Sequence, residues 1–271
     1  MDLVHVVLTA AGREVEFDLT FDPSFVSDVA IQTLSQRKGP PEPELLHVLA
    51  RVLREGDIAI DVGANVGYFT IVMANFVGLK GRVFAFEPGP QNKAKLADNI
   101  RVNKLGNVEV VHKVLWHEST EMTFHLAHDS GLNSLAPSEV TLSSAQVRTA
   151  TLDDYKIATL SPHRVNPRLL KIDAEGAEEH ILRGARQMLS QGIDYVICEL
   201  NEAALQRLNS SQETLRDYML LRGYSTFLIR EDGGLPIMVP EKTRILPRLN
   251  CSLVMFTSPS NVGAAWPEVG T

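Results

Sequence analysis

The segment IAIDVGANVGYFTIVMANF, residues 58–76, decides the fold. Its first part, residues 58–62, is an apolar run with the length of a buried strand, and apolar residues recur at helical spacing from Phe69 to Phe76. Gly63 and Gly67 stand between the two parts, where they allow a tight turn and the close approach of a ligand to bare backbone. The segment therefore predicts a strand, a glycine turn and a helix, which is the repeating unit of parallel α/β sheets.

The same alternation continues on both sides of this segment. We predict further strands at 82–86, 107–112, 169–173, 195–200, 224–229 and 252–257, with helices at 44–53, 69–76, 90–103, 177–190 and 212–223. Strands separated by helices need crossover connections, and these produce a largely parallel sheet. The expected fold class is α/β, a doubly wound and mostly parallel sheet.

The chain divides into three predicted parts. Residues 1–41 are expected to form an appendage, with a hairpin over 3–20 that turns at Ala11-Gly12 and a short helix over 24–35. Residues 42–258 form the α/β domain. Residues 259–271 lack periodicity, and we expect a flexible tail there.

Composition narrows the classes of partner. Lys and Arg number 26 against 33 Asp and Glu, and the net charge of −7 argues against a general nucleic-acid or anionic-membrane surface. Cys198 and Cys251 are too few for a disulfide framework or a thiolate metal site. The N-terminus lacks the basic leader of a signal peptide, and the longest uncharged stretch, 62–79, contains glycine, asparagine and threonine. We therefore expect a cytoplasmic protein with no membrane partner.

Acidic residues end the first two strands of the predicted domain. Asp61 lies at the end of the first strand, and Glu87 directly follows the second. Ligands of doubly wound sheets bind at the carboxyl ends of the strands, and a carboxylate placed there can accept hydrogen bonds from ribose hydroxyls. The two acids and the glycine turn between them predict a nucleotide cofactor site. The structural alternative is a tight strand-to-helix connection without a ligand.

The spacing of the glycines distinguishes between nucleotides. A dinucleotide fingerprint has glycines at offsets zero, two and five, and from Gly63 the second and third of these positions hold Asn65 and Tyr68. No glycine-rich loop ends in Gly-Lys-Ser/Thr, so the triphosphate version is also absent. These departures favour S-adenosylmethionine, with its amino-acid end over the turn. A nicotinamide-dependent oxidoreductase stays open as a rival, as does a binding module without turnover.

Several segments resemble the FkbM-type family of S-adenosylmethionine-dependent methyltransferases. They are DVGANVGYFTIVMA (61–74), FAFEPGPQNKAKLADNI (84–100), NVEVV (107–111), ATLDDY (150–155), LLKIDAEGAEEHILRGA (169–185) and ICELN (197–201). The resemblance covers about residues 42–201. It implies a class I, Rossmann-like methyltransferase fold, whose seven-stranded sheet has an antiparallel last strand. It also implies O-methylation of hydroxyls on polyketides, sugars, glycans or other small metabolites.

The resemblance assigns cofactor roles by position. Glu87 would hold the ribose, Glu42 matches the family's entry motif, and the cofactor turn would consist of Asp61, Gly63, Asn65 and Gly67. The chain departs from the family after the third strand, where Val114-Leu115-Trp116-His117 replaces a small residue followed by Leu-Ser-Asp. Trp116 either flanks the adenine or the substrate, or covers the sheet edge, and both interpretations stay open.

Candidate catalytic groups follow from the chemistry. Methyl transfer to a hydroxyl needs the oxygen placed behind the methyl carbon and its proton removed. Asp173 is the first candidate to contact substrate or cofactor, with capping of the next helix as its alternative. Glu199 is a second candidate base and His117 a third. Lys171 is expected to pair with one of the acids.

A magnesium ion is compatible with Asp173, Glu199 and Asn201, but nothing in their spacing requires one, and we predict no metal site. The predicted acceptor is a hydroxyl of a small molecule or glycan precursor, with N-methylation of an amine or peptide as the alternative. Acceptor choice is expected to reside in segments 22–41, 116–140 (with Asn133 and Ser134) and 231–250. The sequence leaves a homodimer open.

Overall fold

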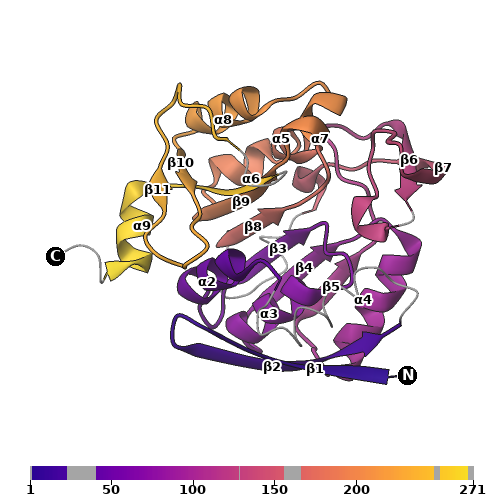
Figure 1. Ribbon diagram of the computed structural model, residues 1–271, viewed down its shortest axis with the longest axis horizontal. Coiled ribbons are helices and arrows are strands. Elements are labelled where there is room, and N and C mark those ends of the chain that lie inside the picture. The colour runs from indigo at the N-terminus through magenta and orange to yellow at the C-terminus, as the bar shows by residue number, and fades with distance from the viewer. Residues whose placement is uncertain (1, 23–40, 128, 156–165, 247–250, 268–271) are drawn as a thin grey trace.

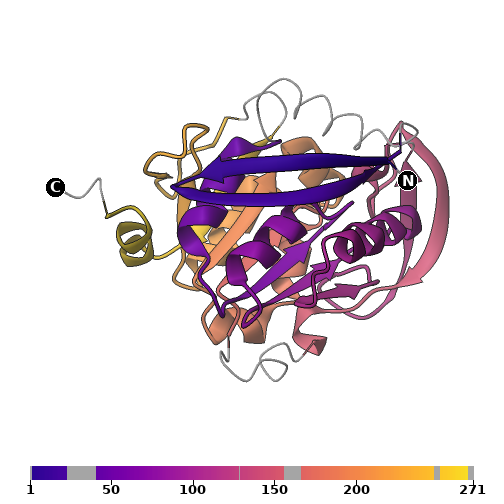
Figure 2. The same cartoon turned by 90° about the horizontal axis from the view of Figure 1, so that it is seen from below.

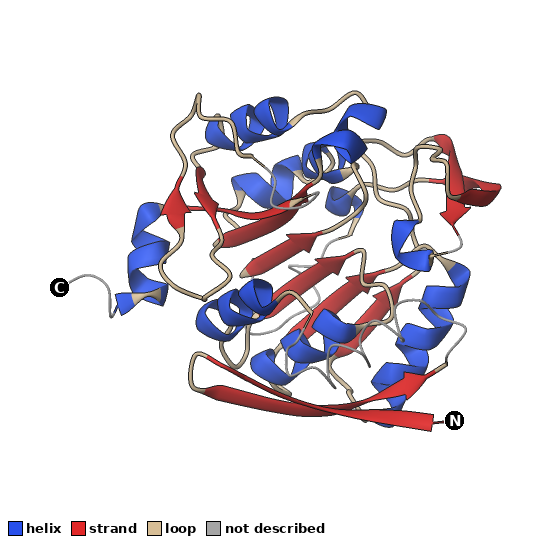
Figure 3. Cartoon of the chain, viewed as in Figure 1, coloured by secondary structure: helices blue, strands red, loops and turns tan. Residues whose placement is uncertain are grey.

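One sheet with helices on both faces forms the centre of the molecule (Figures 1 and 3). The computed structural model describes residues 2–22, 41–127, 129–155, 166–246 and 251–267. The strands of the sheet are β3 (Ile58–Val62), β4 (Arg82–Phe86), β5 (Val108–Val111), β8 (Leu169–Ile172), β9 (Tyr195–Leu200), β10 (Ser225–Leu228), β11 (Ile237–Met238) and β12 (Ser252–Thr257). Their order is β11-β10-β12-β9-β8-β3-β4-β5.

The pairing confirms the predicted class. Strands β3, β4, β5, β8 and β9 run parallel, and β12 lies antiparallel between β9 and β10. The last strand of the chain thus runs opposite to both of its neighbours, as the resemblance implies. The eighth strand, β11, is a two-residue addition that pairs with β10. It lies inside the connection 231–250, whose glycines and prolines are typical of a loop, so a strand of two residues could not be predicted there.

Two layers of helices cover the sheet. One layer contains α2 (Pro43–Val52), α3 (Tyr68–Val77) and α4 (Pro90–Val102), and the other contains α5 (Glu178–Arg183), α6 (Arg186–Ser190), α7 (Glu202–Arg207) and α8 (Gln212–Leu220). The single helix predicted over 177–190 is two helices. They part at Gly184, where the backbone oxygen of Trp116 comes so close that an added Cβ would lie 2.2 Å from it.

The predicted N-terminal hairpin is present as β1 (Asp2–Ala10) and β2 (Arg13–Phe21), and it lies across α2 and α3 (Figure 2). Polar side chains fix it to the domain. Arg13 donates to the carbonyl oxygens of Ala50 and Leu53, and Asn99 accepts from the backbone and hydroxyl of Thr20. The helix expected over 24–35 lies outside the described residues.

A second hairpin stands beside the carboxyl ends of the strands. It consists of β6 (Glu121–Ala127) and β7 (Thr141–Arg148), joined through the short 3-10 helix η1 (Ser130–Leu132), and another short helix, η2 (Leu152–Asp154), follows it. The sequence predicted irregular structure here. Most residues of β7 are exposed and polar, so the strand lacks the alternation by which a half-buried strand is recognised.

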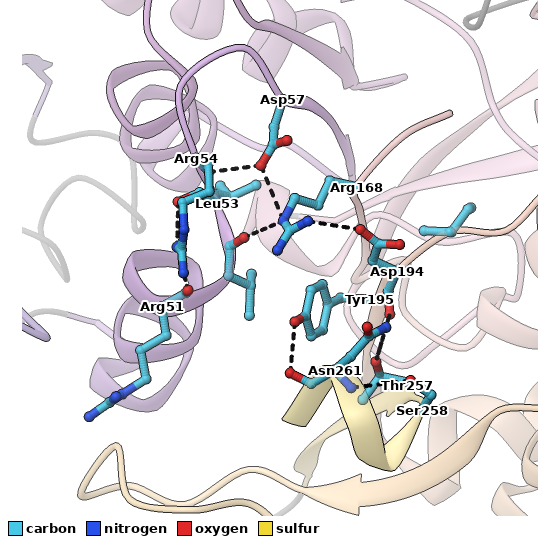
Figure 4. Close-up of polar contacts among 12 residues, drawn as sticks. Arg51, Leu53, Arg54, Asp57, Arg168, Asp194, Tyr195, Thr257, Ser258 and Asn261 are labelled. Atoms are coloured by element: carbon cyan, nitrogen blue, oxygen red, sulfur yellow. Dashed lines mark hydrogen bonds and ion pairs between the residues drawn. The ribbon is translucent and has the colours of Figure 1, made fainter. Parts of the chain in front are cut away.

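The expectation of a flexible tail was wrong for the residues after β12 that the structure describes. Ser258 caps helix α9 (Pro259–Ala265), and the ring of Trp266 is buried, with its nitrogen donating to the Gly233 oxygen. Tyr195 donates from its hydroxyl to the Asn261 oxygen (Figure 4). These contacts stabilise a helix too short to show a period in the sequence.

Candidate functional site

A cavity of about 350 Å³ lies at the carboxyl ends of β3, β4, β8 and β9, where doubly wound sheets bind ligands. Each of these strands contributes a residue at its end, namely Gly63, Glu87, Asp173 and Glu199. The segment 113–115 after β5 and the loop 129–135 between β6 and β7 complete the wall. The second hairpin therefore encloses the site from the far edge of the sheet.

The glycine turn packs backbone against backbone. Gly63 has a φ of +76°, and an added Cβ would lie 1.8 Å from the backbone carbonyl oxygen of Asp173, so no other residue fits there. Gly67, at a φ of +93°, begins α3, and its Cβ would meet Leu96 at 2.4 Å. Asn65 also adopts a positive φ, of 51°, which is strained for a residue with a side chain. Gly63 and Asn65 line the cavity, whereas Gly67 supports the turn from behind.

Glu87 is held rigidly at the cavity wall. Its carboxylate accepts from the backbone nitrogens of Asn65 and Gly89, each at 2.8 Å, and from the Asn92 side chain at 3.4 Å. Burial raises the pKa of Glu87 to about 7, although these donors act in the opposite direction. The Asn65 contact joins this acid directly to the glycine turn.

Asp61 is buried behind the cavity. The Thr70 hydroxyl donates to it at 2.6 Å, and Lys171 Nζ lies 3.2 Å from its other oxygen. Lys171 Nζ also lies 3.6 Å from an Asp173 oxygen and donates to the Gly63 oxygen at 3.2 Å. Burial lowers the pKa of Lys171, but the surrounding carboxylates raise it more, so the ammonium stays charged. Asp61 thus supports the site through Lys171 and does not line it.

Carboxylates gather at the other end of the cavity. Oxygens of Asp173, Glu175 and Glu199 lie within 4.8 Å of one another, and Glu42 at the start of α2 faces them. Desolvation and repulsion from Asp173 raise the pKa of Glu42 and of Glu175 to about 8, and that of Glu199 to about 7. Such a group can attract a positively charged ligand, for example a sulfonium or a divalent cation.

Asn201 does not take part in this group. Its side chain accepts from the backbone nitrogen of Ala204 and caps α7. Glu175, which stands in the left-handed region with a φ of 52°, occupies the place that the sequence analysis considered for Asn201.

Trp116 and His117 lie outside the cavity. Trp116 is buried and stacks on His180 with ring centroids 3.8 Å apart, and His117 Nδ1 lies 3.2 Å from His180 Nδ1. Val114 and Leu115 after β5 line the cavity, whereas the side chains of Trp116 and His117 contact His180 of α5. The structure therefore supports the covering role for Trp116, and it does not bring His117 to the other candidate catalytic groups.

The loop 129–135 holds lining residues that the sequence identified only in part. Ser134 Oγ donates to the backbone carbonyl oxygen of Glu175, and the Asn133 side chain accepts from the Ala127 backbone nitrogen. Both residues therefore stabilise the loop that lines the cavity. The sequence analysis missed Asn92, which donates to the Ser130 oxygen and thereby ties this loop to the Glu87 segment. Its place in the first turn of the helix that follows Glu87 is the signal that could have found it.

The chain is similar to several known proteins. Residues 61–226 match the family model of the methyltransferase FkbM domain. Hexuronic acid methyltransferase AglP of Haloferax volcanii is 26% identical over 167 residues, which are 59% of this chain and 62% of that protein. Methyltransferase 1 of Beauveria bassiana is 25% identical over 197 residues, 65% of this chain and 76% of that protein. A crystal structure of methyltransferase FkbM from Methylobacillus flagellatus KT is 17% identical, covering 84% of this chain and 58% of its own, with a TM-score of 0.48.

The family match includes the glycine turn, Glu87 and the segment from Lys171 to Glu178, which build the cavity described above. Within the described ranges, no helix has the length and apolar character needed to cross a membrane. The match gives no support to the nicotinamide-dependent alternative. Because it spans more than half of the 271 residues, the chain belongs to the FkbM family of S-adenosylmethionine-dependent methyltransferases.

Proposed function

We propose that the protein transfers a methyl group from S-adenosylmethionine to a hydroxyl of a small metabolite, sugar or glycan precursor. The observation that carries the proposal is the placement of acidic side chains at two opposite ends of the cavity. An anchored carboxylate, Glu87, stands on one side of the glycine turn, and Asp173 and Glu199 stand on the other. A ribose and a reacting centre need separate acids of this kind.

Glu87 suits the ribose because its position does not depend on the ligand. Its two backbone donors hold the carboxylate in place, and carboxylate oxygens can accept further hydrogen bonds from hydroxyls. Gly63 suits the amino-acid end of the cofactor, since its backbone lines the cavity, and the missing side chain lets this turn pack directly on the Asp173 backbone. Lys171 contacts both the carbonyl oxygen of Gly63 and the carboxylate of Asp173, and it thereby orients the two groups that would lie beside the amino-acid end of the cofactor.

Asp173 and Glu199 are the proposed groups at the reacting centre. During transfer, the acceptor oxygen attacks the methyl carbon, the carbon–sulfur bond breaks, and the hydroxyl proton passes to a carboxylate. Glu199, whose pKa is raised to about 7 by desolvation and by Asp173, is matched to accept a proton near neutral pH. The acidic group also favours the sulfonium before transfer over the neutral thioether after it.

The relatives support a sugar acceptor without fixing it. The Haloferax protein is named for a hexuronic acid, and this chain spans about three fifths of its length. N-methylation of an amine remains the second candidate, because the carboxylates around Asp173 would also bind a protonated amine. The two are distinguished by the mass and acid stability of the methylated product.

Calorimetric titration with S-adenosylhomocysteine tests the cofactor site, with NAD as the second ligand. We expect binding of the first compound only. Glu87→Ala should weaken it by roughly tenfold to a hundredfold, the worth of hydrogen bonds to a charged group. Glu109→Ala serves as the matched control, because Glu109 pairs with Arg82 at the sheet edge and lies outside the cavity. Binding of NAD, or of neither compound, would contradict the proposal.

A further inference from the structure

The loop between β8 and α5, residues 173–177, carries two of the carboxylates at the acidic end of the cavity. Asp173 and Glu175 line the cavity from this loop. Glu175 has a φ of 52° and Gly176 a φ of 103°, so two consecutive residues adopt left-handed backbone. This conformation is strained for a residue with a side chain, and it persists only where the surrounding structure enforces it.

Glu178 binds the backbone of this loop. Its Oε1 accepts from the backbone nitrogen of Ala174 at 2.8 Å and from that of Gly176 at 3.3 Å. These are the amides on either side of Glu175, and one carboxylate oxygen can accept from both because it has two lone pairs. Backbone amides converge in this way on an anion where the chain passes into left-handed backbone.

Glu178 makes these bonds at a cost to the stability of the fold. The residue is 1% exposed, and its Oε2 has no hydrogen-bond partner among the described residues. Burial raises the pKa of Glu178 to about 7, although the backbone donors lower it. A buried carboxylate destabilises a protein unless its contacts offset the loss of water. The two bonds to the loop are therefore the contribution that this side chain makes.

Two other roles agree less well with the contacts of Glu178. Capping of α5 does not account for the bonds, because the helix begins at Glu178 and both amides precede it. Contact with a ligand does not account for them either. Of the described residues in this segment, Ala174 and Ala177 line the cavity and Glu178 does not. The side chain thus contacts the loop from behind the cavity wall.

Backbone packing holds the two ends of the loop. The carbonyl oxygen of Asp173 lies against Gly63, and an added Cβ on Gly176 would lie 2.3 Å from the Ala204 oxygen. Between these ends, the amides that flank Glu175 bond to the Glu178 carboxylate. Loss of this acceptor should therefore free the centre of the loop while its ends stay in place.

We propose that Glu178 is a positioning residue that directs Asp173 and Glu175 toward the cavity by binding the amides of the loop that carries them. The inference rests on the proposed methyl transfer, in which Asp173 lies at the reacting centre, and adds a residue on which that centre depends. It also gives Glu175 a role, because its carboxylate is then held where it faces the sulfonium.

Glu178→Met and Glu178→Gln form a matched pair of variants. Both remove the charge and keep a side chain of similar size, but only glutamine keeps an oxygen that can accept from the two amides. The difference between them therefore reports the hydrogen bonds and not the charge or the volume. Glu109→Met is the control for an acid at the sheet edge, outside the cavity.

Amide exchange, followed by NMR, measures the loop directly. We expect the amides of Ala174 and Gly176 to be protected in the wild type and in Glu178→Gln. In Glu178→Met they should exchange at least about tenfold faster, because two buried donors lose their acceptor. The amides of β9 should keep their exchange rates in every variant, which shows that the sheet is intact.

Calorimetry at about pH 9 measures the consequence for the cavity. The affinity for S-adenosylhomocysteine should agree within about twofold between the two variants, because Glu87 holds the ribose at the opposite end. The advantage of S-adenosylmethionine over S-adenosylhomocysteine should be roughly threefold smaller in Glu178→Met than in Glu178→Gln, since Asp173 and Glu175 then face the sulfonium less closely. A merely structural role would weaken both compounds equally and leave this ratio unchanged.

Each way of failing has its own result. Unprotected amides of Ala174 and Gly176 in the wild type would show that Glu178 does not hold the loop. Equal ratios in the two variants would show that it does not direct the carboxylates. If S-adenosylhomocysteine does not bind the wild type, the proposed function fails, while amide exchange still tests the positioning role. Should Glu178→Met not fold, Glu178→Asp, whose carboxylate is one methylene too short to reach both amides, takes its place in comparison with the wild type.

Discussion

A basic residue lies toward each end of strand β8, with Arg168 directly before the strand and Lys171 within it, and the two ends of the sheet differ in how these residues are used. At the amino end, Arg168 lies 3.2 Å from Asp57 and 2.9 Å from Asp194, in a network that includes Tyr195 and Asn261 (Figure 4). At the carboxyl end, Lys171 lies between Asp61 and Asp173 in the same manner. Both ends of the strand therefore share one arrangement, a basic side chain between two aspartates.

The surroundings make the difference. Around Lys171 and Asp173 stand five further carboxyl groups with raised pKa values, those of Glu42, Glu87, Glu175, Glu178 and Glu199. Three residues with side chains adopt left-handed backbone at this end, namely Glu42, Asn65 and Glu175. Strain and uncompensated charge of this kind persist at functional sites because the rest of the fold enforces them. The ion pairs at the amino end stabilise the sheet, whereas the strained backbone and clustered acids at the carboxyl end are destabilising and are suited to binding a ligand.

Replacing Lys171 should have the largest effect. Lys171→Met leaves Asp61 buried with only the Thr70 hydroxyl as partner, and removing one member of a buried ion pair destabilises by about 3 to 5 kcal/mol. We expect that loss in urea unfolding, together with weakened S-adenosylhomocysteine binding, because the Gly63 oxygen also loses its donor.

The double variant Lys171→Met with Asp61→Asn sharpens this prediction. It removes both buried charges, so it should recover a large part of the lost stability while binding stays weak. Equal stability of the single and double variants would show that Asp61 does not depend on Lys171.

Arg168→Met tests the amino end. Arg168 is 22% exposed in its side chain, so water can partly replace it, and Asp57 still accepts from the Arg54 backbone nitrogen. We therefore expect a smaller loss of about 2 to 3 kcal/mol. The affinity for S-adenosylhomocysteine should not change, because none of the residues labelled in Figure 4 lines the cavity. A change in that affinity beyond about twofold would contradict the separation of the two ends.

The sequence predicted the central strands well for a physical reason. Those at 58–62, 82–86 and 195–200 are buried on both faces, and such strands appear as uninterrupted apolar runs. The glycine turn and Glu87 were also predictable, since a strand end fixes where the next side chains point.

The remaining features depend on contacts that periodicity does not record. The split at Gly184 comes from the Trp116 backbone, and the place of Trp116 itself comes from stacking on His180. Helix α9 depends on Asn261 and on burial of Trp266. Likewise, nothing in the sequence shows that Glu175 replaces Asn201, because this arrangement arises from packing between distant segments.

Glu178 offers a smaller test of the carboxyl end. It is buried, and burial raises its pKa to about 7 against the backbone donors of Ala174 and Gly176. A carboxyl group with a raised folded pKa stabilises fully below its ordinary value of 4.5, and this contribution is lost as the pH rises through about 7. Glu178→Gln should therefore gain about 1 to 2 kcal/mol relative to the wild type between pH 5 and pH 8.5 in urea unfolding. A constant difference across that range would show that Glu178 does not titrate.

The smallest predicted effect concerns the choice between the two forms of the cofactor. Glu42, Glu175 and Glu199 lose protons between about pH 6 and pH 9, so the cavity becomes more negative over that range. S-Adenosylmethionine carries a sulfonium charge that S-adenosylhomocysteine lacks, and its advantage in affinity should rise by roughly threefold to fivefold, about 1 kcal/mol or less for charges near solvent. Calorimetry of both compounds at pH 6 and pH 9 measures this ratio, and Glu175→Gln should flatten its rise while Glu109→Gln leaves it intact. A ratio independent of pH would mean that the sulfonium does not face these carboxylates, and the methyl group would then have to lie away from Asp173 and Glu199.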